Sequence, residues 1–77
     1  MNNPQQVPLN PLRKKPAMDS AYWYPDLKNA DLISREGWAD FNIDRRLLAL
    51  GICFETPQEA AECARRMLAA IKVESAP

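Results

Sequence analysis

Apolar residues recur at helical spacing over the C-terminal third of the chain. Counted from residue 60, the spacing i, i+4, i+7, i+8 and i+11 brings them onto one side of a helix. The members of this stripe are Ala60, Ala64, Met67, Leu68 and Ile71, with Cys63 at its flank. One amphipathic helix is therefore the clearest element that the pattern predicts.

The residues before this stripe form a helix-start signature, Thr56-Pro57-Gln58-Glu59. Thr56 can accept a hydrogen bond from the Glu59 N–H, and the Glu59 side chain can return to the Thr56 N–H. Pro57 suits the first helical position, where a missing N–H costs nothing. We expect the helix to run to about Lys72 and residues 73–77 to fray.

A second helical feature is an ion pair. Glu62 and Arg66 stand four residues apart on the outer side of this predicted helix. Pairs at this spacing stabilise a helix by about 0.2–0.5 kcal/mol.

The densest aromatic segment is Ala21-Tyr22-Trp23-Tyr24, followed by Pro25. Aromatic residues favour strands, and proline ends a strand or restricts it to a sheet edge. A period of two places Tyr22 and Tyr24 on one face and Trp23 on the other. Because a sheet packed on a single helix covers one face only, we expect a large aromatic side chain to stay near the surface.

The segment between residues 26 and 54 has weaker periodicity. Residues 26–31 read as a turn rich in Asp and Asn, and residues 32–35 as a second strand, followed by Glu36-Gly37, which would allow a bend or a bulge. In residues 40–44, apolar and polar positions alternate, which predicts a short strand or an ordered loop pinned by Trp38 and Phe41.

Residues 45–50 favour helix, but Gly51 stops the run after six residues. We expect a single helical turn with Gly51 in the left-handed conformation. Residues 52–54 are apolar and predict a short strand or an extended entry into the C-terminal helix.

Four prolines and several Asn and Gln residues fill residues 1–20. Such a segment forms neither helix nor central strand, so we expect a flexible, disordered arm. It carries a basic run, Arg13, Lys14 and Lys15. This run is either a solvated charge cluster or a tether to a phosphate backbone or an acidic surface.

These elements predict an α+β fold, in which a small antiparallel sheet of two or three short strands packs on one C-terminal helix. The domain spans residues 21–73, the arm residues 1–20 and a frayed tail residues 74–77. A domain of this size is marginal alone, which favours a partner or self-association.

Ten basic and ten acidic residues balance to a net charge of zero. A strongly basic nucleic-acid binder and a strongly acidic DNA mimic are both disfavoured. Residues 1–20 contain no apolar run typical of a secretory segment, and no stretch is long enough to span a membrane. We therefore expect a cytoplasmic protein with no membrane association, in which Cys53 and Cys63 are reduced and buried.

The residue types offer little for chemistry. The chain has no histidine, so the usual base for a serine or cysteine nucleophile is missing, and two cysteines do not make a zinc site. Two carboxylate pairs, Asp40 with Asp44 and Asp26 with Asp31, are interpreted as caps of local N–H groups. We expect no enzymatic activity, no catalytic residue, no metal and no cofactor.

Residue types that dominate interface energies gather between residues 22 and 46. They are Tyr22, Trp23, Tyr24, Trp38, Arg45 and Arg46. The aromatic residues serve either as core or as contact surface, and we expect Trp23 or Trp38 to be at least partly exposed. The two arginines are either solvated or anchors for a carboxylate or phosphate.

The chain resembles small phage and prophage proteins that share an aromatic strand, a tryptophan followed six positions later by aspartate, and a G-N-x-F-x-T-x-E-E-A helix entry. Here these are Tyr22-Trp23-Tyr24, Trp38, Asp44 and Gly51 to Ala60, with Ile52 in place of asparagine and Gln58 in place of an acid. The resemblance covers residues 22–72. It implies a hairpin or short meander packed on one helix.

The resemblance and the small size indicate a non-enzymatic protein of phage type that binds a host protein in the bacterial cytoplasm and blocks it sterically. An inhibitor of a bacterial defence system such as CRISPR is the sharpest version. Two alternatives stay open. One is an accessory nucleic-acid binder that uses the basic arm and an exposed aromatic residue, and the other is a homodimeric assembly component.

Overall fold

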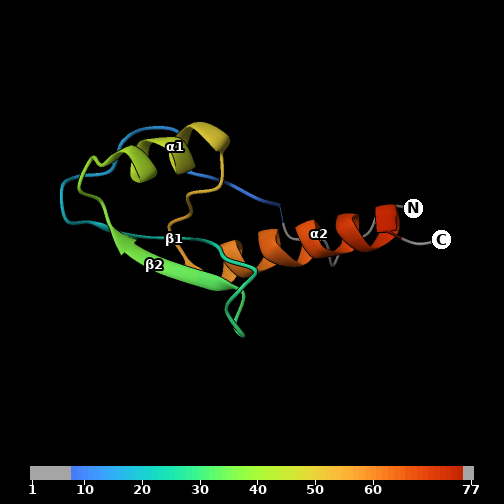
Figure 1. The fold of residues 1–77 in the computed structure, drawn as a ribbon. Helices are drawn as coiled ribbons and strands as arrows, with labels where there is room; N and C mark the ends of the chain where they lie inside the picture. The colour runs from blue at the N-terminus through green and yellow to red at the C-terminus, as the bar shows by residue number, and fades with distance from the viewer. Residues whose placement is uncertain (1–7, 76–77) are drawn as a thin grey trace.

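The computed structural model describes residues 8–75, with side chains up to Lys72. In this range the elements follow in the order β1 (Ala21–Pro25), β2 (Ile33–Gly37), α1 (Asn42–Leu50) and α2 (Pro57–Ser75). The two strands pair antiparallel, and α2 packs on them (Figure 1). This arrangement confirms the predicted small α+β fold. No helix of the described range is long and apolar enough to cross a membrane.

The hairpin is closed by a polar turn built on Asp26. Its Oδ2 accepts from Lys28 Nζ at 2.6 Å and from Ser34 Oγ at 2.6 Å, while Asn29 donates to the Ile33 carbonyl at 2.8 Å. The predicted turn over residues 26–31 is therefore confirmed. The second strand begins one residue later than predicted, because Leu32 has a φ of 70° and belongs to the turn.

Residues 52–54 were predicted as a short strand or an extended entry into the C-terminal helix, and the structure shows no full strand there but one bridge at Phe54. The Trp23 N–H donates to the Phe54 carbonyl at 2.9 Å, and the Phe54 N–H donates to the Trp23 carbonyl at 2.8 Å. The bridge joins the entry of α2 to the edge of β1 that β2 leaves open.

Helix α1 corrects the prediction for residues 40–44. These residues form neither a strand nor a loop throughout, because the helix already begins at Asn42. The alternation of Phe41 and Ile43 does not mark burial, since both are exposed and Asp44 is the buried residue. The end of the helix is as expected: Gly51 has a φ of 77° and its N–H donates to the Leu48 carbonyl at 3.0 Å.

Helix α2 starts as predicted. The Glu59 N–H donates to Thr56 Oγ1 at 3.2 Å, although the Thr56 hydroxyl in turn donates to the Glu59 carboxylate at 3.1 Å. The predicted pair is present, with Arg66 Nε 3.1 Å from Glu62 Oε2. The helix continues to Ser75, past the predicted end at Lys72. The fraying expected for the end of the chain stays a prediction, and residues 76–77 lie outside the described range.

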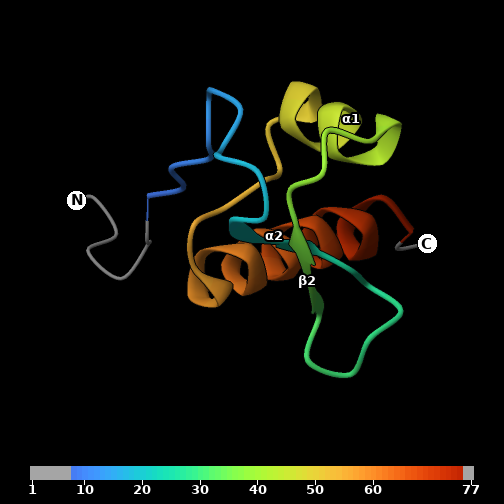
Figure 2. The ribbon, with the colours of Figure 1, turned by 90° about the vertical axis from the view of Figure 1, so that its left-hand side faces the viewer.

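The core consists of two clusters on opposite faces of the hairpin. Tyr22 packs with buried residues on the side of α1, whereas its neighbour Trp23 packs on the side of α2, as successive strand residues point to opposite faces. The first cluster is Tyr22, Trp38, Leu47 and Cys53, and the second is Phe54, Ala60 and Cys63. Figure 2 shows α1 at the top of the molecule and α2 crossing behind β2.

The described part of the arm is not detached from the domain, which corrects the predicted boundary at residue 20. Residues 8–20 contain neither helix nor strand, as expected. However, the Leu12 N–H donates to the Cys53 carbonyl at 2.8 Å, and the Asp19 N–H donates to the Trp38 carbonyl at 2.8 Å. Leu9 and Leu12 each pack on one of the core clusters. The disorder predicted for residues 1–7 lies outside the described range.

Candidate functional site

Two of the four aromatic residues expected at a contact surface belong to the core instead. Tyr22 has no exposed surface and Trp38 is 1% exposed. Their rings meet edge to face, with centroids 6.0 Å apart. The expectation that both could meet a partner is wrong, because α1 and the arm cover the hairpin face that a single-helix fold would leave open.

The other two aromatic residues are half-buried. Trp23 supports the second cluster from the opposite face, and the Arg35 guanidinium lies over its ring at 5.8 Å from the centroid. This arrangement confirms that one of the two tryptophans is partly exposed. Tyr24 packs beside Tyr22, with ring centroids 6.1 Å apart. Both serve mainly as packing, so the hairpin alone offers no large aromatic contact surface.

Asp44 is buried and has a structural role. Its Oδ1 accepts from the Tyr22 hydroxyl at 2.5 Å, and its Oδ2 accepts from the backbone N–H groups of Ala39 at 3.0 Å and Phe41 at 2.9 Å. Burial alone would raise the pKa of this carboxyl, but the three hydrogen bonds outweigh it and hold the pKa below its usual range. Asp44 therefore fixes the start of α1, as the interpretation of these carboxylates as caps predicts.

The Tyr22 hydroxyl, which donates the hydrogen bond to Asp44, has its pKa shifted in the opposite direction. Burial, together with the neighbouring Asp44 carboxylate, raises the pKa of Tyr22 far above its ordinary value. Tyr22 thus stays a neutral hydrogen-bond donor, and the pair offers no acid–base chemistry near neutral pH.

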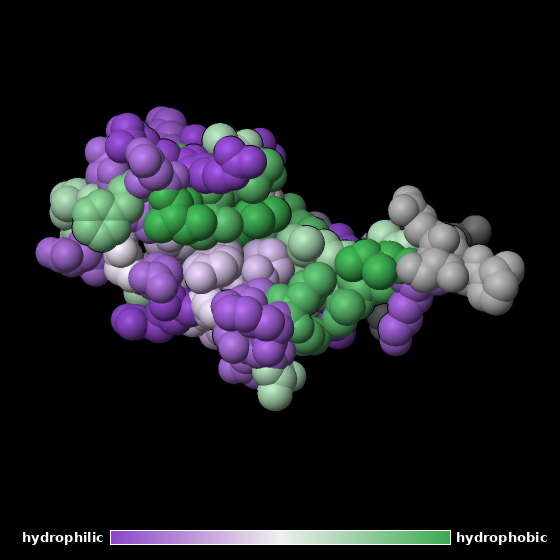
Figure 3. Space-filling model, in the orientation of Figure 1, coloured by the Kyte–Doolittle hydropathy of each residue, from purple (hydrophilic) through white to green (hydrophobic). Residues whose placement is uncertain are grey.

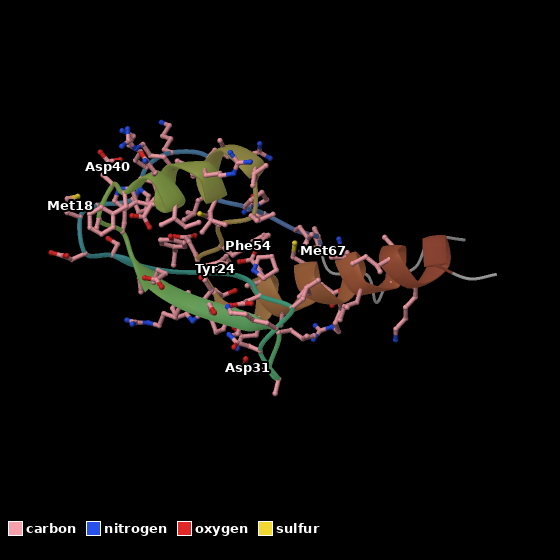
Figure 4. All side chains as sticks on the ribbon, in the orientation of Figure 1. Met18, Tyr24, Asp31, Asp40, Phe54 and Met67 are labelled. Carbon is pink, nitrogen blue, oxygen red and sulfur yellow. The ribbon has the colours of Figure 1, made fainter. Side chains whose placement is uncertain are left out.

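The basic arm and α1 meet at one carboxylate. Lys15 Nζ lies 3.5 Å and Arg45 Nε 3.6 Å from the same oxygen, Asp40 Oδ1. Figure 4 places Asp40 beside the start of α1, far from Asp31 in the hairpin turn. Two basic clusters that are thirty residues apart in the sequence are therefore joined on one side of the molecule. The side chains of Arg13, Lys14, Lys15, Arg45 and Arg46 are all exposed there.

These two contacts bring cations from both clusters together, although the chain as a whole has no net charge. Composition alone could not reveal this, because it does not say which charges share a surface.

Helix α1 and its N-cap residue expose three large apolar side chains that were not predicted as site residues. Phe41 is 66% exposed, Ile43 54% and Leu50 60%. We call Phe41, Ile43, Arg45, Arg46 and Leu50 together the α1 surface. Figure 3 shows a hydrophobic band directly beneath the hydrophilic top of α1.

A helical signal for this surface was present in the sequence. Ile43, Leu47 and Leu50 stand at i, i+4 and i+7, the spacing of one helix face. The alternation from Phe41 to Asp44 concealed it. Leu47 turns into the core, and Ile43 and Leu50 remain outside.

A second apolar region lies on α2. The stripe is buried at Ala60 and Ala64, whereas Met67 is 37% and Ile71 49% exposed. Figure 1 shows the reason, since the second half of α2 extends beyond the end of the hairpin.

The described residues enclose no pocket, and no three of their His, Cys, Asp and Glu side chains come together to hold a metal. Both cysteines are free and buried, as expected. Burial raises the pKa of Cys53 to about 11 and also raises that of Cys63, so neither is a thiolate at neutral pH. The most exposed feature among the candidate residues is the group of apolar side chains on α1.

Comparisons with known proteins do not extend this picture. No protein-family model, no curated protein and no solved structure matches the chain.

Proposed function

We propose that this chain is a non-enzymatic interaction protein of phage type, which binds a protein of the bacterial host through its α1 surface and blocks it sterically. Inhibition of a bacterial defence system such as CRISPR is the sharpest form of this proposal. The origin and the host follow from the resemblance of residues 22–72. The binding surface follows from the geometry of α1.

One observation carries the proposal: Phe41, Ile43 and Leu50 are each more than half exposed within ten residues. Single exposed apolar residues are ordinary in soluble proteins. A cluster of them rimmed by polar residues is typical of an interaction site. Phenylalanine and arginine, which both occur here, are enriched in such interfaces.

The α1 surface is also held rigidly. Asp44 binds two backbone N–H groups at the start of the helix, and Leu47 anchors its inner side in the core. A surface that is ordered before binding loses less conformational entropy when a partner docks. Steric occlusion needs no moving part and no turnover, which suits a domain whose described residues enclose no pocket.

The test begins with capture of partners from a bacterial host on the tagged chain, followed by reconstitution with the purified partner. The variant Ile43→Ser/Leu50→Ser removes the apolar ridge without touching a buried residue. We expect it to weaken binding at least tenfold, since fully burying a leucine or isoleucine side chain contributes about 1.5–3 kcal/mol. The control is Leu27→Ser, at an exposed apolar residue of the hairpin turn. Equal binding by the ridge variant and the control would refute the proposal.

Nucleic-acid binding is a second candidate, favoured by the meeting of Lys15 and Arg45 at Asp40. Affinity for a DNA duplex that falls steeply as salt rises, and that is unchanged in Ile43→Ser/Leu50→Ser, would select it.

Self-association is the third candidate, favoured by the exposure of Met67 and Ile71 on α2. Sedimentation of the pure chain at tens of micromolar decides it, since a monomer removes the homodimer from consideration.

A further inference from the structure

We infer that the α1 surface accepts an acidic protein segment, one that presents apolar side chains flanked by carboxylates. This inference rests on the proposed function and names the chemistry of the partner. It depends on the charged side chains beside the apolar ridge formed by Ile43 and Leu50, and on which of these charges already have an ion-pair partner.

The ridge has a defined length and direction. Ile43 and Leu50 stand seven residues apart, so they lie on nearly the same side of α1 and about 10 Å apart along its axis. That length matches two turns of a partner helix. Phe41 precedes the ridge at the N-cap and extends the apolar contact.

One cation borders the ridge on α1. Arg46 stands three residues after Ile43 and four before Leu50, whereas Arg45, two residues after Ile43, lies toward the other side of the helix and contacts Asp40. Among the described side chains of residues 8–72, Arg46 has no ion-pair partner. A partner that brings a carboxylate beside the ridge therefore meets a cation that these residues leave without an ion pair, whereas a basic partner meets repulsion.

The apolar ridge decides between classes of acidic partner. A nucleic acid gains from the cations and can stack one base on Phe41, but it gains nothing from burying Ile43 and Leu50, which offer neither a flat ring nor a hydrogen bond. An anionic lipid surface would use both features, but two aliphatic side chains and one ring give little apolar area for insertion. A protein segment uses both at once: its apolar side chains cover the ridge, and a carboxylate beside them binds the Arg46 guanidinium in the bidentate geometry that this group favours.

The experiment uses the full chain and a display library of helical peptides about eighteen residues long. All peptides share a leucine stripe at i, i+3, i+4 and i+7, and the flanking positions are randomised to Glu or Lys. We expect selection on the wild-type chain to enrich Glu over Lys at least tenfold. The charge-reversal variant Arg45→Glu/Arg46→Glu should invert this preference, and the control Lys72→Glu, on α2, should not. Equal recovery of Glu and Lys, enrichment of Lys, or no selected peptide would each overturn the inference.

Competing probes complete the test. A duplex of about twenty base pairs and vesicles of phosphatidylserine and phosphatidylcholine are titrated against the chain at low and moderate salt. Binding to either probe that exceeds binding to the selected Glu peptide at moderate salt assigns the surface to nucleic acid or membrane and overturns the inference.

The inference can fail while the proposed function stands. If the reconstituted partner is lost in Ile43→Ser/Leu50→Ser but binds Arg45→Glu/Arg46→Glu as well as wild type, the α1 surface is confirmed as a contact site and the acidic chemistry is wrong.

Discussion

Replacing Asp44 by alanine is expected to destabilise the domain by about 2–5 kcal/mol. The carboxylate accepts one bond from Tyr22 and two from the backbone before α1. Loss of a cap at a helix start costs about 0.5–2 kcal/mol. Leaving the buried Tyr22 hydroxyl without an acceptor adds about 1–3 kcal/mol. Since a chain of this length is stable by roughly 4–12 kcal/mol, the variant would lose a large share of its stability.

The partner variant Tyr22→Phe removes the donor instead and leaves Asp44 Oδ1 unpaired, at a cost of about 1–3 kcal/mol. Because both variants break the same bond, the double variant should be at least about 1 kcal/mol more stable than the sum of the two changes predicts. Unfolding in urea, followed by tryptophan fluorescence, measures this, since buried Trp38 contacts the Tyr22 ring. Asp31→Ala is the control, as this exposed carboxylate accepts a single long bond of 3.5 Å from the Ile33 N–H. An Asp44→Ala variant within about 0.5 kcal/mol of wild type, or strict additivity of the two changes, would refute the structural role of this pair.

Three further predictions concern other parts of the molecule. Because the pKa of Asp44 is lowered on folding, the stability it contributes should be lost as pH falls below about 4. The raised pKa of Tyr22 should cost stability as pH rises above about 10, and Tyr22→Phe should reduce this alkaline loss in urea titrations across pH, while the raised pKa values of Cys53 and Cys63 maintain the remainder. Gly51→Ala should cost about 1 kcal/mol through its φ of 77° alone, because no atom lies within 4 Å of the added Cβ, and a loss above about 3 kcal/mol in thermal unfolding would contradict this account. Leu12→Ala should cost about 1–2 kcal/mol in urea if the described arm belongs to the domain, and an unchanged midpoint would show that this contact is dispensable.

The part of the fold that sequence could predict is the part governed by local rules. Thr56, Pro57 and Glu59 specify the start of α2 through bonds between near neighbours, and the structure reproduces that start. The turn after β1 and the left-handed Gly51 are local in the same sense. Each depends on the preference of a few adjacent residues and not on distant contacts.

Helix α1 depends on a distant contact, and the sequence could not predict it. Its start is held by Asp44, and that carboxylate is fixed by Tyr22, twenty-two residues earlier in the chain. Without knowledge of this bond, the alternation of residues 40–44 predicts a strand. Once α1 was missed, the Tyr22 face of the hairpin had no cover, and the burial of Tyr22 and Trp38 could not be foreseen.

In the candidate site too, the features set by neighbouring residues were predicted and those set by distant contacts were not. Arg45, Arg46 and the run Arg13 to Lys15 were predicted as contact residues, and the structure shows them exposed. That Lys15 and Arg45 share a carboxylate at Asp40 follows only from the docking of the arm by Leu12. The apolar ridge was invisible as long as residues 40–44 were expected to be extended.

Strand β1 lies between the two core clusters, and this position links the folding of one cluster to that of the other. Tyr22 faces one core cluster and Trp23 the other. A one-residue shift in the register of the hairpin would move each ring to the opposite face, and the packing of both clusters would be lost. Neither half can therefore settle on an alternative pairing while the other keeps the native one. The small protein should therefore form its two core clusters in a single cooperative step, because both require the same register of the hairpin.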